Sequence, residues 1–211
     1  MASDPNLILI EDLLYLVGAF IGFSVAYVSY QGYRDIGSPT MLRLTIAFLL
    51  LGGGFTLSGI VGLADLGVLP YITLLISSLV LGASLLEAAG YFFLAFSHMM
   101  NVRGFGKGGM NSTITLSAAI PVAALKSVSL YFLMYGVIET VIAYFKVRRF
   151  ETLTIAIGLG LIAAAEFIRW TSYLYPSIAT ILILSLVIKV LGFSTLYIPV
   201  LRFASLRGRL A

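Results

Sequence analysis

Five ionisable residues stand inside long apolar stretches of this 211-residue sequence: Glu87, Glu139, Glu166, Arg169 and Lys189. A charged side chain at the centre of a bilayer costs about 3 kcal/mol on insertion scales. Such residues therefore pair with one another, face water-filled cavities, or mark a path for protons and ions. These five residues are the first candidates for chemistry.

Glu87 and Lys189 occupy similar surroundings in the sequence. The stretch EAAGYFF (87–93) aligns with KVLGFST (189–195), so that an acid in one takes the place of a base in the other. Two opposite charges that face each other across a helical bundle would relieve much of the cost of burial. The pattern fits both a solute- or ion-binding site and a structural salt bridge.

The other acids differ in their nearest neighbours. Glu166 and Arg169 are three positions apart, on one face of a helix, and we expect them to form a structural ion pair. Glu139 has only uncharged neighbours at three and four positions: Tyr135, Gly136, Ile142 and Ala143. An acid without a charged partner in lipid is expected to be protonated or to face a cavity. Glu139 is therefore the strongest single candidate for a proton- or cation-linked role.

Composition decides what kind of elements must position these residues. The chain is 60% hydrophobic and only 10% charged, with a mean hydropathy of +1.06. Soluble domains carry about 25% charged residues. The chain therefore lies in lipid as a single transmembrane domain over 1–211, and six or seven helices of about 20 residues account for its length. The net charge of +4 fits cytoplasmic Lys and Arg and indicates no nucleic-acid partner.

Several classes of site are excluded by residue counts. The absence of cysteine excludes disulfides, thiolate metal sites and cysteine nucleophiles. A single histidine excludes a haem held between two histidines of this chain. We find no nucleophile–base arrangement, no metal-ligand spacing and no phosphate-binding loop, so we expect neither an enzyme nor a metal site.

Apolar stretches predict five clear spans, at 8–31, 41–63, 70–98, 150–174 and 177–203. The stretch 113–145 would be about 50 Å long as one helix, too long for one straight crossing. Two crossings with a break near Lys126 place the clusters of Lys and Arg on one side, as cytoplasmic loops require. We therefore predict an all-α protein of the plasma membrane with seven helices, the N-terminus outside and the C-terminus cytoplasmic. Six helices plus a re-entrant segment at 110–126 is the alternative.

Three short matches predict an internal repeat. They pair 26–34 with 143–149, 48–55 with 161–167, and 87–93 with 189–195. They come in the same order in each half, which predicts a three-helix repeat over 8–98, a linker helix at 110–126 and a second repeat over 128–203. Parallel repeats of this kind occur in transporters, with binding sites near the bilayer midplane.

Two segments resemble the microbial rhodopsins: KVLGF (189–193) and RWTSYLYP (169–176). The resemblance implies a retinal Schiff base on Lys189 with Glu87 as its counter-ion. The sequence departs from that family, since Pro176 stands only 13 residues before Lys189 and Ser185 takes the place of a second acid. We therefore expect no bound cofactor, with retinal on Lys189 as the alternative. The three-plus-one-plus-three plan also resembles small sugar transporters, but their proline–glutamine signature is absent.

These patterns favour a small transporter or channel with a charged midplane site at Glu87, Glu139 and Lys189. The alternative is a sensory, ligand-binding or scaffold subunit of a membrane complex. The expected partners are the lipid bilayer and a small solute, proton or cation, with a membrane protein or a second copy as a further option. Transport predicts a water-accessible cavity around the charges, whereas a scaffold predicts a closed bundle in which every charge is paired.

Overall fold

A computed structural model describes residues 5–68, 73–99, 122–172 and 179–207 of the chain. These residues form six α-helices: α1 (Pro5–Ile36), α2 (Pro39–Asp65), α3 (Thr73–Met99), α4 (Val122–Val147), α5 (Phe150–Ser172) and α6 (Ala179–Arg207). Each contains 19 to 31 consecutive residues with a mean hydropathy of 1.6 to 2.2. Helices of this length and composition indicate a polytopic, all-α membrane protein.

Two tight turns have the same construction. Gly37 ends α1 with a φ of +66°, and its amide donates to the carbonyl of Tyr33 at 2.7 Å. Arg148 follows α4 with a φ of 49°, and its amide donates to the carbonyl of Tyr144, also at 2.7 Å. A residue in the left-handed region closes a helix in this way. Each turn therefore reverses the chain within two residues.

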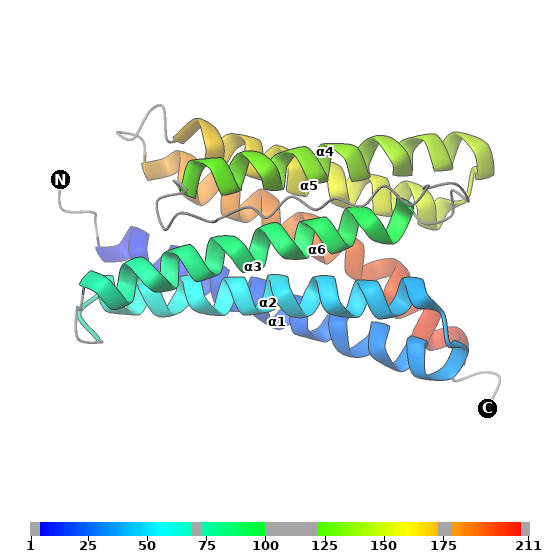
Figure 1. The fold of residues 1–211 in the computed structure, drawn as a ribbon, viewed down its shortest axis with the longest axis horizontal. Helices are drawn as coiled ribbons and strands as arrows, with labels where there is room; N and C mark the ends of the chain where they lie inside the picture. Colours follow the sequence, from blue (N-terminus) through cyan, green and yellow to red (C-terminus); the bar gives the residue numbers. More distant parts are fainter. Residues whose placement is uncertain (1–4, 69–72, 100–121, 173–178, 208–211) are drawn as a thin grey trace, which may run out of the picture.

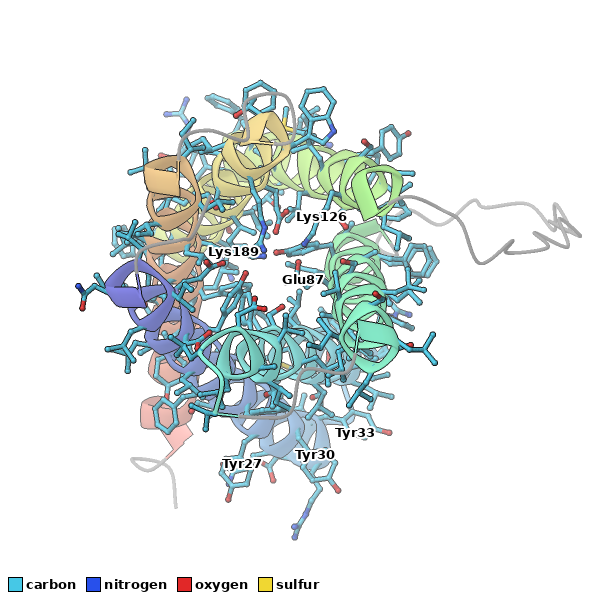
Figure 2. The ribbon with its side chains drawn as sticks, turned by 90° about the vertical axis from the view of Figure 1, so that its left-hand side faces the viewer. Tyr27, Tyr30, Tyr33, Glu87, Lys126 and Lys189 are labelled. Carbon is cyan, nitrogen blue, oxygen red and sulfur yellow. The ribbon has the colours of Figure 1, made fainter. Side chains whose placement is uncertain are left out.

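The six helices form a closed ring. Each helix packs against its neighbours in chain order, and α6 returns to pack against α1. Figure 2 looks along this ring from the end at which α1 begins. Glycines bring the backbones close: a Cβ on Gly22 of α1 would lie 3.1 Å from the Cα of Gly52 on α2. Small residues at helix contacts are typical of packing in lipid.

The outer surface of the ring is apolar, whereas its interior contains both apolar and charged side chains. Large apolar side chains cover the outer surface, as lipid requires. Tyr27, Tyr30 and Tyr33 point outward from α1, toward its C-terminal end (Figure 2). Aromatic rings prefer the headgroup level, so this end of α1 suits the membrane boundary.

Helices α3 and α4 run in the same direction (Figure 1). The side-chain contacts agree, because Glu87 meets Lys126 near the start of α4, whereas Ala95 lies beside Gly136 further along both helices. Met99 and Val122 therefore lie at opposite ends of the bundle, as do the start of α1 and the end of α6. Residues 100–121 lie outside the described part, so the predicted seventh crossing remains a prediction.

One predicted helix break is corrected. The sequence predicts a helix break near Lys126. Helix α4 instead runs from Val122 to Val147 without interruption, and the Lys126 side chain is buried. The physical reason is that two carboxylates neutralise the ammonium group of Lys126, so this lysine does not have to end the helix at the membrane surface.

Candidate functional site

Four buried charges meet inside the ring, one from each of four consecutive helices. Glu87 comes from α3, Lys126 from α4, Glu166 from α5 and Lys189 from α6. We call these four residues the charge cluster. Their side chains are only 1–5% exposed, and Figure 2 shows Glu87, Lys126 and Lys189 pointing toward the centre of the ring. The cluster thus lies where lipid cannot reach it.

Each carboxylate of the charge cluster touches both ammonium groups. Glu87 forms an ion pair with Lys126, and its Oε2 lies 3.3 Å from Nζ of Lys189. Glu166 forms an ion pair with Lys189, and its Oε2 lies 3.9 Å from Nζ of Lys126. The formal charges cancel, and the alternating arrangement puts opposite charges next to each other. This arrangement offsets a desolvation cost of several kcal/mol per ion.

Aromatic rings complete the surroundings of Lys189. Its ammonium nitrogen lies 4.8 Å from the ring centroid of Phe55 and 5.6 Å from that of Tyr91. Ring faces attract cations at such distances. The Tyr91 hydroxyl also donates a hydrogen bond of 3.0 Å to Oε1 of Glu166. Lys189 is therefore held by two carboxylates and two ring faces.

The charge cluster is not centred along the bundle. Lys126 lies in the second turn of α4 and Glu166 in the last two turns of α5, so the cluster lies in the half nearer the start of α1. Buried apolar side chains fill much of the other half, among them Phe48, Leu51, Leu94, Leu159 and Leu196. Phe193 lies between the two regions and makes edge-to-face contacts with Phe55 and Phe48. The distances between ring centroids are 5.3 Å to Phe55 and 6.0 Å to Phe48. The polar and apolar halves of the interior are therefore distinct.

Glu87 and Lys189, aligned in the sequence, are in direct contact. Glu139 is elsewhere: along α4 it is separated from Lys126 by about 20 Å at 1.5 Å per residue. It is partly buried and accepts a 3.0 Å hydrogen bond from the Tyr135 hydroxyl one turn earlier. The sequence predicts no charged partner for Glu139 in its own helix. The structure shows a neutral partner there, because positions i and i+4 share a helix face.

The partners of Glu166 are interhelical. Its ion pairs go to Lys126 and Lys189, whereas the Arg169 guanidinium lies 5.6 Å from the ring centroid of Tyr15 on α1. The predicted Glu166–Arg169 pair within α5 remains a prediction. Among the described side chains, no group of three or more His, Cys, Asp or Glu is arranged to hold a metal ion.

Comparisons with protein-family models, with curated proteins and with solved structures find no match to this chain.

Sequence reasoning missed two members of this site. A helix break is predicted near Lys126, although this lysine stands within the apolar stretch VAALKSVSL (122–130). Tyr91 was not singled out. It follows Glu87 by four positions, on the same helix face, and this spacing could have placed it beside the acid. Neither residue could be assigned to Glu166 without knowing which helices are neighbours.

Proposed function

We propose that the protein is a small transporter, seen here in a closed state, that exchanges a proton or small charged solute at the charge cluster. The observation that carries this proposal is the double pairing: each of Glu87, Lys126, Glu166 and Lys189 contacts two opposite charges. A structural salt bridge needs only one partner per charge. A site that opens and closes benefits from a second partner.

The physical argument concerns what happens when the helices move. Removing one partner from a simple buried pair leaves a lone charge, which costs about 3–5 kcal/mol. In the charge cluster, separating Lys126 from Glu87 leaves Lys126 beside Glu166 and Glu87 beside Lys189. Contacts can therefore be exchanged for a proton, water or a solute without leaving any charge alone. Glu166 Oε2, which has no hydrogen-bond partner, is an acceptor available for this exchange.

The internal repeat belongs to the same proposal. A Cβ on Gly90 of α3 would meet Leu51 of α2, and a Cβ on Gly192 of α6 would meet Ile162 of α5, each at 2.6 Å. Both glycines lie three positions after a charge of the aligned pair, Glu87 or Lys189. We propose that α1–α3 and α4–α6 are two similarly packed units with this pair at their boundary. Transporters built from repeats bind their substrates at such boundaries.

A scaffold or sensory subunit is the second candidate. The observation in its favour is that all four charges of the cluster are paired and nearly inaccessible. A bundle that never opens would hold them in the same way, and a partner protein would then cover part of the apolar outer surface.

Thiol labelling separates these two candidates without knowledge of the substrate, since the chain has no native cysteine. Ser185 is buried on α6, one turn before Lys189, and Ser29 is buried on α1. A site that opens makes Ser185→Cys react in membranes with a small, water-soluble thiol reagent, while the control Ser29→Cys reacts much more slowly. Equal protection of both positions, under proton gradients of either direction, would leave the scaffold as the better explanation.

Flux measurements locate the exchanging group. Proteoliposomes with an internal pH dye and an imposed membrane potential report proton movement. We expect Glu166→Gln to abolish the flux and Glu139→Gln, the same change outside the charge cluster, to leave it largely intact. The reverse result would return the proton-linked role to Glu139. If the wild-type protein moves no proton under a membrane potential of either sign, a proton is not the exchanged species.

A further inference from the structure

A second buried acid lies at the end of the bundle where α1 begins. Asp12 on α1 is only 4% exposed, and neither oxygen of its carboxylate has a hydrogen-bond partner. The carboxylate lies directly against Gly62 of α2, in the space that a Cβ at position 62 would occupy. Only glycine at position 62 leaves room for this contact. The Asp12 carboxylate is therefore closely packed between α1 and α2, yet no hydrogen-bond donor contacts it there.

The charges near Asp12 make an ionised carboxylate less favourable still. Glu11 from its own helix and Asp65 from α2 are the charged groups that act on it, and both are acids. The Arg169 guanidinium from α5 is placed over the ring of Tyr15, one turn further along α1. On α6, which also packs against α1, the described side chains at this end are not titratable: Ile181, Leu182, Ile183, Leu184 and Ser185.

A buried carboxylate without a donor does not keep its charge. Burying an ionised group unpaired is so costly that the group neutralises instead, by taking a proton or a cation. A metal cation needs several oxygen ligands, and the described residues hold no cluster of three acids or histidines. A proton needs only the carboxylate itself.

We propose that Asp12 is a proton-binding site of the closed bundle. Its carboxyl group carries a proton while α1 and α2 pack together at Gly62, and it ionises when these helix ends separate and admit water. This site is independent of the charge cluster, and it links the packing of α1 on α2 to pH. It stands whether the protein transports a solute or serves as a scaffold.

Infrared spectroscopy of the full-length protein in lipid at mildly acidic pH, where exposed carboxyl groups are still ionised, tests the proposal directly. The carbonyl stretch of a protonated carboxyl group should be present in the wild type and should lose one component in Asp12→Asn. The control Glu11→Gln removes the neighbouring acid and should keep that component. Gly62→Ala should remove it while Asp12 is still present, because the added methyl group pushes the carboxyl group out of its place. A spectrum unchanged by Asp12→Asn would overturn the proposal.

Thermal unfolding supplies an independent readout. Unfolding exposes Asp12 and releases its proton above the pH at which a free carboxyl ionises, so stability should fall as pH rises. In Asp12→Asn the melting temperature should fall less steeply as pH rises, while Glu11→Gln, which keeps Asp12, should retain most of the wild-type slope. Identical slopes in wild type and Asp12→Asn would contradict a bound proton. A melting temperature raised by NaCl but not by choline chloride, with the effect lost in Asp12→Asn, would replace the proton by a metal cation.

Discussion

Tyr91 on α3 donates a hydrogen bond of 3.0 Å to the Glu166 carboxylate on α5. The tyrosine is fully buried, and its ring also lies 5.6 Å from the ammonium nitrogen of Lys189. The hydroxyl therefore fixes one oxygen of Glu166 while the ring face borders the cation that pairs with it. Through this one side chain, α3 contacts both α5 and α6 across the interior of the ring.

Removing this hydroxyl should weaken the bundle. Tyr91→Phe keeps the ring but takes a donor from a charged acceptor, and such hydrogen bonds contribute about 1.5–3 kcal/mol. We expect a loss of about 2 kcal/mol in the free energy of unfolding, measured by denaturant titration in detergent. Tyr131→Phe makes the same change at an exposed ring and should have almost no effect. Equal losses in the two variants would mean that the Tyr91 hydroxyl is not specific to the cluster.

The stability of the protein should depend more on the balance of positive and negative charge in the charge cluster than on the number of charges. Lys126→Met leaves two acids beside one base, and Glu87→Gln leaves two bases beside one acid; each should cost about 3–5 kcal/mol. The double variant keeps the Glu166–Lys189 pair and restores neutrality, so its melting temperature should exceed that of either single variant. Losses that simply add would show that Glu87 and Lys126 are not coupled.

Glycine positions in the helix contacts should differ sharply in their tolerance of a methyl group. A Cβ at Gly192 would lie 2.6 Å from Ile162 and 2.9 Å from the carbonyl of Gly158, so Gly192→Ala should destabilise the protein by about 1–3 kcal/mol. Gly160 has nothing within 4 Å of such a Cβ, and Gly160→Ala should be neutral or stabilising by up to about 1 kcal/mol. Similar unfolding curves for the two variants would contradict the packing of α5 on α6.

The sidedness of the membrane can be tested with single cysteines. Ile36 and Arg148 lie at one end of the bundle, while Val68 lies at the other (Figure 1). The distribution of Lys and Arg predicts that the first end is cytoplasmic. An impermeant thiol reagent added outside intact cells should label Val68→Cys, and it should label Ile36→Cys and Arg148→Cys only after permeabilisation. External labelling at position 148 would invert the predicted topology.

The membrane class followed from composition, and most helix positions followed from the apolar stretches of the sequence. A chain with 60% hydrophobic residues needs lipid as its solvent, and each apolar stretch long enough to cross forms a helix because backbone groups have no other partners there. All five clear spans correspond to helices α1, α2, α3, α5 and α6. The alignment of 87–93 with 189–195 also singled out two residues that are in contact.

The burial of these charges could be predicted from the sequence, because Glu87, Glu166 and Lys189 stand in apolar stretches long enough to cross a bilayer. Their partners could not be predicted, because these partners come from other helices. The sequence predicts a helix break near Lys126. Its position in the charge cluster depends on α4 lying between α3 and α5. Helix periodicity places a side chain on a face but does not say which helix that face meets. The order of the helices around the ring therefore decides which charges neutralise one another, and which acid, like Asp12, is left without a donor.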